Sequence, residues 1–340
     1  MARSTVYNNI VKPELWEQVN KKNKELIKDW VEYLQSVDRS KKTIEQYVND
    51  LKIFFCWFLE KANNKFFIEI NKKDVMKFQN YCLTVLKISS SRIRRLRSTI
   101  SSLSNYIESM LDIEYPDFRN IINRIPAPTK QEVREKTVLD DTEIQLLLDT
   151  LVNKKQYQQA CVVALAMASG CRKSELLRFK VSYFDEKNII CGSLYRTPEK
   201  IKTKGRGSTG KLLYKYILVT QFKKYLDLWL KEREILNITS EWLFVSLQTS
   251  EELKVTTLDG WTKEFSKIVN KDFYFHCLRH YFTTNLSKAN IPDKVIQEIG
   301  GWSSLEMVSL YTDITIDDEL DKYFSKDGIK KIEKKSLNDL

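Results

Sequence analysis

Hydrophobic residues in the first third of the chain recur at intervals of three and four, the spacing of one face of an α-helix. The clearest stripe contains Ile44, Tyr47, Val48, Leu51, Phe54, Phe55 and Phe58. Stripes of this kind predict four helices, at about residues 22–35, 44–58, 73–86 and 92–110. Ser40 or Thr43 is placed to cap the second of them, and Asn71 or Asp74 the third. We therefore expect a four-helix bundle in residues 21–112, preceded by an N-terminal extension of residues 1–20.

The pattern changes after residue 112. Pro116, Pro126 and Pro128 interrupt the helical spacing, so residues 113–136 are expected to form a linker. A second domain is then expected at 137–324, opening with a helix capped by Asp140 or Asp141. Within it, the apolar stretch Tyr157–Ser169 predicts a buried helix that ends at Gly170.

The middle of the second domain lacks helical spacing. The segments VSYFDEKNIICGSLYR and LLYKYILV within residues 181–219 predict strands, joined by the polar loop KTKGRGSTGK. Helical spacing returns at 221–236, 257–270, 276–290, 292–300 and 304–313. Ser303 and Glu306 fit a capping box for the last helix. The predicted fold is therefore mainly α, a four-helix bundle plus an α-rich domain with a small antiparallel β-sheet, and 325–340 is a C-terminal tail.

Composition adds a positive charge to this picture. The 340 residues contain 56 Lys and Arg against 45 Asp and Glu, a formal net charge of +11. Residues 1–112 hold 20 of the basic and 13 of the acidic residues, and therefore +7 of that charge. A cluster of arginines stands in the fourth predicted helix, at Arg92, Arg94, Arg95 and Arg97. This balance favours a nucleic acid as partner and makes these arginines candidate DNA contacts.

Other partners are not indicated by the sequence. The longest apolar run, residues 160–168, is too short to cross a bilayer, and the first residues lack the apolar core of an export signal. The six cysteines are scattered without metal-ligand spacing, and no glycine-rich nucleotide loop is present. We therefore expect a cytoplasmic protein that needs no metal or cofactor and does not bind a membrane.

Three separated stretches contain residues that together suit one chemistry. ASGCRKSELL carries Arg172, HCLRH carries His276 and Arg279, and GGWSSLEMVSLY carries Trp302 and Tyr311. Two guanidinium groups can neutralise the oxygens of a phosphodiester under attack, and a histidine can move a proton. A tyrosine can serve as the nucleophile. The set predicts phosphoryl transfer at a phosphodiester.

Each residue by itself has a plainer structural interpretation. Arg172 can be a surface arginine, His276 a buried histidine, and the two aromatic residues part of a core. Glu175, one turn after Arg172, can hold that arginine or interact with a helix start. His280 is interpreted as a structural or supporting residue.

Taken together, the order and spacing of these residues resemble the tyrosine recombinase (phage integrase) family. The resemblance rests on Arg172 with Glu175, the HxLRH of 276–280, the GGW of 300–302 and Tyr311, and it extends over roughly residues 20–320 because TIEQYVNDLKIFFCWF resembles the family's N-terminal domain. It points to a Cre-like or Xer-like two-domain type. It implies that 21–112 is a core-binding, SAM-like DNA-binding domain and that 137–324 is the catalytic domain.

The same resemblance implies the role of each site residue. Tyr311 would be the nucleophile that forms a 3′-phosphotyrosine link, Arg172 and Arg279 would hold the phosphate, and His276 and Trp302 would assist. A lysine of the predicted hairpin would be the general acid. Lys204 is preferred for that role, while Lys202 and Lys211 stay as alternatives. Lys202 and Arg206 are also expected to contact DNA.

The implied substrate is duplex DNA with a core site of the inverted-repeat type. Strands would be exchanged through a Holliday junction by a homotetramer on DNA, without metal or ATP, by a protein that is a monomer or weak oligomer when free. A bacterial or phage origin and an association with the nucleoid are implied as well. The alternatives are a type IB topoisomerase or telomere resolvase, and a DNA-binding regulator without catalysis.

Overall fold

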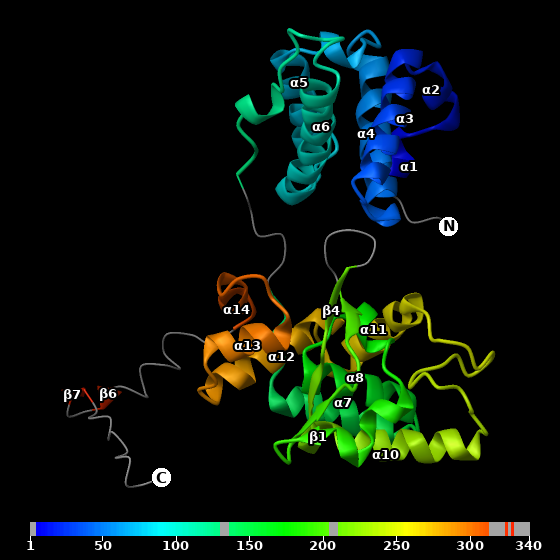
Figure 1. Ribbon diagram of the computed structural model, residues 1–340, viewed down its shortest axis with the longest axis vertical. Helices are drawn as coiled ribbons and strands as arrows, with labels where there is room; N and C mark the ends of the chain where they lie inside the picture. The colour runs from blue at the N-terminus through cyan, green and yellow to red at the C-terminus, as the bar shows by residue number, and fades with distance from the viewer. Residues whose placement is uncertain (1–4, 130–135, 204–209, 313–323, 326–327, 330–340) are drawn as a thin grey trace. The chain divides into compact units, whose positions relative to one another are not determined.

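The computed structural model describes residues 5–129, 136–203, 210–312, 324–325 and 328–329. These residues fall into two compact units. The first contains 5–129, and the second contains 136–203 and 211–312. Figure 1 shows the elements of each unit. Each unit has a hydrophobic core of its own.

The first unit is a helical bundle. Its helices are α1 (Val6–Ile10), α2 (Pro13–Gln18), α3 (Lys21–Ser36), α4 (Lys41–Lys61), α5 (Lys72–Thr84) and α6 (Ser90–Met110), with 3₁₀ turns η1 (Phe67–Glu69) and η2 (Ile122–Arg124). The predicted four helices are α3 to α6. In addition, α1 and α2 pack against α4, because the apolar Ile10 and Val19 are buried in the bundle core.

Side-chain caps explain where these helices begin. The Ser40 hydroxyl accepts a hydrogen bond from the Thr43 amide at the start of α4, and Asn71 and Asp74 cap α5 reciprocally. Inside the bundle, α4 packs against α3 and α6 (Figure 1). The fully buried Trp30, Leu51 and Phe54 belong to its core.

Of the four arginines predicted to contact DNA, Arg97 is the one that the fold buries. Its side chain is buried and donates hydrogen bonds to the side-chain oxygen of Gln79 and to the carbonyls of Ile122 and Ile125. Burial lowers the pKa of its guanidinium. These bonds hold η2 against α6, so we expect Arg97 to support the bundle rather than to contact DNA.

The other arginines of α6 are more accessible. Arg92 and Arg95 form ion pairs with the buried carboxylate of Asp50, at 2.6 and 3.4 Å. Arg94 is exposed and donates to the carbonyl of Pro128 at 2.9 Å. Arg94 and Arg95 both present exposed side chains to solvent, so they stay candidates for contact with DNA.

The second unit is α-rich with short strands. Its helices are α7 (Asp141–Asn153), α8 (Tyr157–Ser169), α9 (Lys173–Leu176), α10 (Val219–Ile235), α11 (Val255–Val269), α12 (Phe275–Lys288), α13 (Asp293–Gly300) and α14 (Glu306–Tyr311). Its strands are β1 (Ile189–Ile190), β2 (Leu194–Arg196), β3 (Ile201–Thr203), β4 (Lys211–Leu213) and β5 (Tyr216–Leu218). The chain also forms a short pair, β6 (Phe324–Ser325) with β7 (Gly328–Ile329).

The strands form antiparallel pairs in the order β1-β2-β5, and β3 pairs with β4. One part of the predicted strand region is different, because 181–188 forms the 3₁₀ turns η3 (Val181–Phe184) and η4 (Glu186–Asn188). The side chain of Asn188 donates to the carbonyls of Ser182 and Tyr183, which stabilises these turns in place of a strand ladder.

The α8 helix lies at the centre of the second unit (Figure 1). It packs against α7, α10, α12 and β5, and its residues from Ala160 to Ser169 are all buried. Gly170 ends it with φ of +57°. A Cβ at this position would lie 2.5 Å from the ring of Phe282, so only glycine fits there. The turn at Gly170 therefore positions Arg172, two residues later, beside α12.

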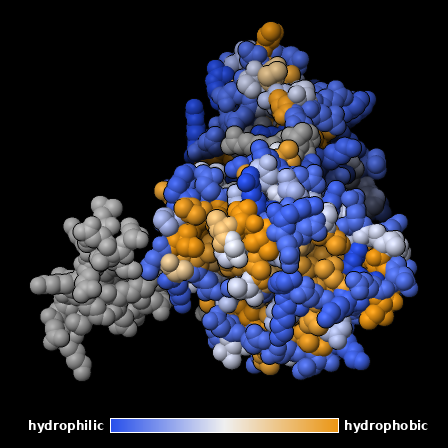
Figure 2. Space-filling model, turned by 60° about the horizontal axis from the view of Figure 1, so that its bottom comes forward, coloured by the Kyte–Doolittle hydropathy of each residue, from blue (hydrophilic) through white to orange (hydrophobic). Residues whose placement is uncertain are grey.

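Figure 2 shows one face of the molecule, on which hydrophobic residues gather in patches among hydrophilic ones. Exposed apolar residues of the second unit include Leu146, Leu212, Ile235, Val295, Leu305 and Leu310. Within the described part of the chain, none of the helices has the length and apolar character needed to cross a membrane.

Candidate active site

The second unit brings the predicted site residues together from separate elements. Arg172 is the residue before α9, while His276, Arg279 and His280 lie on α12. Trp302 follows the turn after α13, and Tyr311 is the last residue of α14. Helices α13 and α14 both pack against α12, which places the aromatic residues over its basic face.

Tyr311 lies at the centre of this group. Its Oη is 2.8 Å from Nε2 of His276. Its ring stacks on Trp302 with 5.0 Å between centroids and lies 4.8 Å from the ring of His280. Only 9% of Tyr311 is exposed. The phenol is therefore held in one orientation by rings on three sides.

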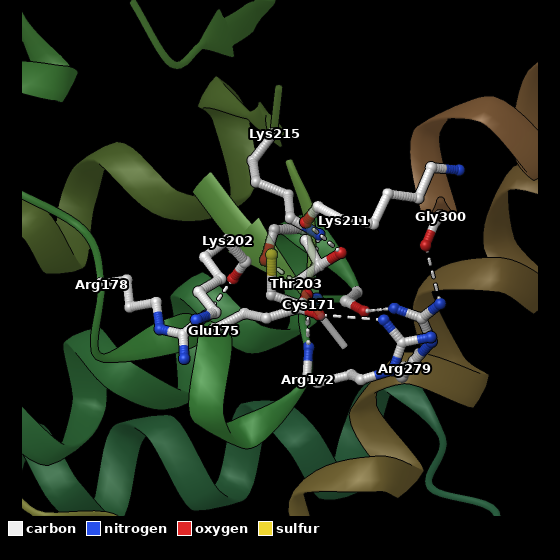
Figure 3. Close-up of polar contacts among 12 residues, drawn as sticks. Cys171, Arg172, Glu175, Arg178, Lys202, Thr203, Lys211, Lys215, Arg279 and Gly300 are labelled. Carbon is white, nitrogen blue, oxygen red and sulfur yellow. Dashed lines mark hydrogen bonds and ion pairs between the residues drawn. The ribbon is translucent and has the colours of Figure 1, made fainter. Parts of the chain in front are cut away.

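Arg279 lies beneath the aromatic residues and is 1% exposed. It donates to the carbonyl of Gly170 at 2.6 Å. It also donates to the carbonyl of Gly300 at 2.8 Å (Figure 3). Its Cζ is 4.4 Å from the centre of the Trp302 ring. Burial, and then the positive charge of Arg172, lower the pKa of Arg279. The guanidinium is thus fixed between two helix ends.

Two buried donors at this site make no hydrogen bond within the described part of the chain. They are Nε of Arg279 and Nε1 of Trp302. An unpaired buried donor is costly, and native proteins keep few of them. Two such donors beside a phenol favour an anionic ligand with several oxygen acceptors.

Arg172 is held by Glu175. Its Nη1 donates to Oε1 of Glu175 at 2.9 Å, and its backbone amide donates to Oε2 at 3.2 Å. Both interpretations of Glu175 from the sequence are therefore confirmed, since it holds the guanidinium and interacts with the start of α9. Glu175 is itself fully buried.

Lys215 is a residue of this region that sequence reasoning missed. Its Nζ donates to Oε2 of Glu175 at 2.7 Å, although Lys215 is only 2% exposed. The alternation of side chains places Lys215 on the same inward face as Ile217, which is fully buried. A lysine at an inward position of a strand is unusual, and that signal was available in LLYKYILV.

The charges around His276 favour its neutral form. Burial, followed by His280, Arg279 and Arg172, lowers the pKa of His276 to about 4. His276 is an exposed residue, so solvent also reaches the imidazole ring. A neutral Nε2 can accept a proton from the Tyr311 hydroxyl.

Comparisons with known proteins agree with this geometry. Residues 137–317 match the model described as the phage integrase family, and 26–117 match the phage integrase N-terminal SAM-like domain. The chain belongs to the phage integrase family. The expected fold class, family and enzyme class are confirmed, and the chain is a tyrosine recombinase, an enzyme of DNA strand breakage and rejoining.

Relatives of this phage integrase span most of its length. The SPbeta prophage-derived recombinase-like protein YomM of Bacillus subtilis is 30% identical over 265 residues, covering 77% of this chain and 76% of its own. Tyrosine recombinase XerA of Pyrococcus horikoshii is 26% identical over 298 residues, covering 86% and 90%. The fold is similar to that of the lambda integrase tetramer bound to a Holliday junction, with a TM-score of 0.63, 21% identity, and coverage of 85% and 76%.

The hairpin lysines of this integrase are only partly described. Lys204 and Arg206 lie outside the described residues. Lys202 on β3 and Lys211 on β4 are exposed, and they flank the segment that contains Lys204 and Arg206. The hairpin lies close to the site. Gly301 is the residue before Trp302, and a Cβ at this glycine, whose φ is +67°, would be 2.3 Å from the side chain of Leu213 on β4.

The capping box expected for the last helix is wrong. Leu305 is the N-cap of α14, and it makes no side-chain cap hydrogen bond. The backbone already turns before Glu306, because Met307 and Val308 donate to the carbonyls of Ser304 and Leu305. Ser303 therefore stands too early in the chain to cap this helix.

Proposed function

We propose that Tyr311 is the nucleophile of a site-specific recombinase. Its Oη attacks the phosphorus of a phosphodiester in duplex DNA, and the bond to the 5′-oxygen breaks. The products are a 3′-phosphotyrosine link and a 5′-hydroxyl. The phenolic proton passes to Nε2 of His276, and a general acid supplies a proton to the leaving oxygen. Rejoining reverses these transfers, so the reaction conserves the energy of the phosphodiester.

The observation that carries this proposal is the 2.8 Å contact between Tyr311 Oη and His276 Nε2. A phenol needs an adjacent base to become a nucleophile, and a nucleophile within hydrogen-bond reach of its base is the expected arrangement. The lowered pKa of His276 supports the assignment, because the ring must be neutral to accept the proton.

The arginines supply the charge that the reaction requires. The attacked phosphate gains negative charge on its non-bridging oxygens, and fixed donors around it stabilise that charge. Arg172 and Arg279 are close enough that the charge of Arg172 lowers the pKa of Arg279, after burial. The unpaired Nε of Arg279 and Nε1 of Trp302 add two donors. A phosphate seated here would satisfy both.

The general acid is assigned to the β3–β4 hairpin. Lys204 stays the preferred residue, with Lys202 and Lys211 as alternatives. The exposure of Lys202 and Lys211 supports a hairpin that contacts DNA with its basic residues. A 5′-bridging phosphorothiolate substrate tests each lysine, because a thiolate leaves without a proton. Methionine in place of the general acid should slow cleavage of normal DNA but not of this substrate.

We further propose that the enzyme exchanges strands as a tetramer on a core site with inverted repeats, and is a monomer or weak oligomer when free. The lambda integrase structure is a tetramer on a Holliday junction, which supports this arrangement. Exposed apolar residues on or beside α13 and α14, among them Val295, Leu305 and Leu310, offer a surface for a neighbouring protomer. Action in the cytoplasm, in association with the nucleoid, stays a prediction.

The topoisomerase and telomere-resolvase alternatives are not favoured, because the relatives that span the chain are named recombinases. A supercoiled plasmid distinguishes them. A topoisomerase relaxes it without a specific sequence, whereas a site-specific recombinase requires its core site.

Trapping the covalent intermediate tests the nucleophile. A duplex is first selected from a randomised pool by its binding to the full chain, and single nicks are then placed at successive positions. The wild-type protein should form an adduct that survives denaturation, and Tyr311→Phe should bind the DNA without forming one. Tyr281→Phe, which removes the hydroxyl that donates to Asp141 at 2.7 Å, is the matched control and should keep the adduct. An adduct that persists in Tyr311→Phe would overturn the assignment.

A further inference from the structure

Lys215 stands out as a buried cation that the proposed reaction does not use. Only 3% of its side chain is exposed, and its Nζ donates to Oε2 of Glu175 at 2.7 Å. The 1% exposed Glu175 side chain also binds Nη1 of Arg172 through Oε1, at 2.9 Å. One buried carboxylate therefore lies between two cations, Lys215 and Arg172 (Figure 3).

The three charged side chains differ in their exposure to solvent. The Arg172 side chain is 23% exposed, whereas the other two are almost completely enclosed. Burial by itself raises the pKa of the Glu175 carboxyl, but Lys215 and then Arg172 outweigh it, so the pKa lies below its ordinary value. With Lys215 absent, Arg172 would be the remaining neighbour to balance a buried anion.

The backbone around Lys215 is fixed as firmly as its side chain. Its amide donates to the Thr197 hydroxyl at 3.0 Å, and its carbonyl accepts from the Thr197 amide at 3.0 Å. These bonds continue the ladder of β2 and β5, in which Arg196 lies opposite Tyr216. Lys215 therefore connects the sheet to the turn that carries Arg172, and it lies between β4 of the hairpin and β5.

We propose that Lys215 is a positioning residue for the DNA phosphate: it holds Glu175 ionised and in place, so that the Arg172 guanidinium keeps both its orientation and a net positive charge. This inference rests on the proposed function. Lys215 neutralises the carboxylate from inside the protein, and the charge of Arg172 is then left for the phosphate. The buried Nζ, bonded to Glu175, is not placed to reach the leaving 5′-oxygen, so Lys215 is distinct from the general acid of the hairpin.

The test measures the rate of adduct formation on the selected nicked duplex, with the full chain. Lys215→Met should lower this rate about a hundredfold, the loss expected when a phosphate-binding group is misplaced by about 1 Å, while the affinity for DNA stays unchanged. Lys215→Arg keeps the charge and should retain most of the rate. Lys187→Met is the matched control, since it removes a lysine bound to Asp185 on the surface of the same unit.

A 5′-bridging phosphorothiolate duplex separates positioning from acid catalysis. It should not restore the rate of Lys215→Met, because the arginine is still misplaced. If Lys215→Met does not fold, the double variant Lys215→Met with Glu175→Gln buries neither charge and should be about tenfold slower than wild type, since a neutral amide holds Arg172 less firmly. Thermal unfolding of each variant establishes that it is folded.

Three results would overturn the proposal. The first is a wild-type rate for Lys215→Met or, if that protein does not fold, for the double variant. The others are full rescue of Lys215→Met by the phosphorothiolate duplex, and a rate for Lys215→Arg as low as that for Lys215→Met. None of them affects the assignment of Tyr311. If the proposed function itself is wrong, the result is different: the wild-type protein then forms no adduct that depends on Tyr311.

Discussion

The hydroxyl of Tyr311 and Nε2 of His276 lie 2.8 Å apart, although 35 positions separate the two residues in the chain. The contact depends on α12 and α14, which pack against each other. It is completed by Trp302, which stacks on the phenol, and by Arg279, which lies under both rings. The proposed base, the proposed nucleophile and a cation therefore meet within one small cluster.

Cleavage should persist in mildly acidic solution. Burial, His280 and the two arginines lower the pKa of His276 to about 4, so its neutral form survives below the ordinary value near 6.5. The rate of adduct formation, measured against pH, should stay level down to roughly pH 5.5 and fall as the ring becomes protonated nearer 4. His276→Gln should lose about 10²- to 10⁴-fold in rate and this acid limb with it. A fall centred near pH 6.5 in the wild type would contradict the prediction.

The same shift affects stability. An unfolded His276 takes up a proton below about pH 6.5, whereas the folded one resists it. Its contribution to the free energy of unfolding is therefore complete above that pH and is lost as the pH falls towards 4. Urea unfolding of wild type and His276→Gln at several pH values measures the difference.

Trp302 should act through its N–H as well as its ring. Trp302→Phe keeps an aromatic ring beside Tyr311 but removes the unpaired Nε1 donor, and we expect a loss of about a hundredfold in cleavage rate with little loss of DNA affinity. Trp242→Phe, at a half-buried indole that contacts Lys180, is the control. Equal rates for Trp302→Phe and the wild type would show that the indole N–H does not contact the phosphate.

Gly170→Ala should destabilise the second unit. A methyl group there lies 2.5 Å from Phe282, and φ of +57° disfavours any L side chain. We expect a loss of about 1–3 kcal/mol in the free energy of unfolding, measured with urea. Cleavage should also slow, because the Gly170 carbonyl accepts the bond from Arg279. Gly260→Ala, inside α11 with nothing within 4 Å of the new carbon, should instead stabilise by about 0.5–1 kcal/mol.

In the first unit, Arg97 and Arg94 should behave differently. Arg97→Met removes the guanidinium that donates to the carbonyls of Ile122 and Ile125 and should cost about 1–3 kcal/mol of stability. Arg94→Met should leave stability nearly unchanged and reduce the salt dependence of DNA binding by about one unit of slope. Measuring unfolding and salt-dependent binding for both variants tests this division. A stable Arg97→Met protein with weakened DNA binding would contradict it.

The sequence by itself predicted the family, most of the helices and the candidate residues of the site. Periodic apolar residues identified α3 to α6, because local spacing decides which face of a helix is buried. The motifs around Arg172, His276, Arg279, Trp302 and Tyr311 predicted their chemistry, since each carries a functional group that few other side chains can replace.

Only the tertiary structure decided how those groups are supported. Three of these supports involve residues far apart in the chain. They are the burial of Arg97, the pairing of Lys215 with Glu175, and the two carbonyls that accept hydrogen bonds from Arg279. The 3₁₀ turns at 181–188 and the absent Ser303 cap likewise depended on contacts of neighbouring side chains and on the path of the backbone. The local sequence shows which residues are charged. The free-energy cost of burying a charge depends on the groups that the fold packs around it, and so does the choice of its partner.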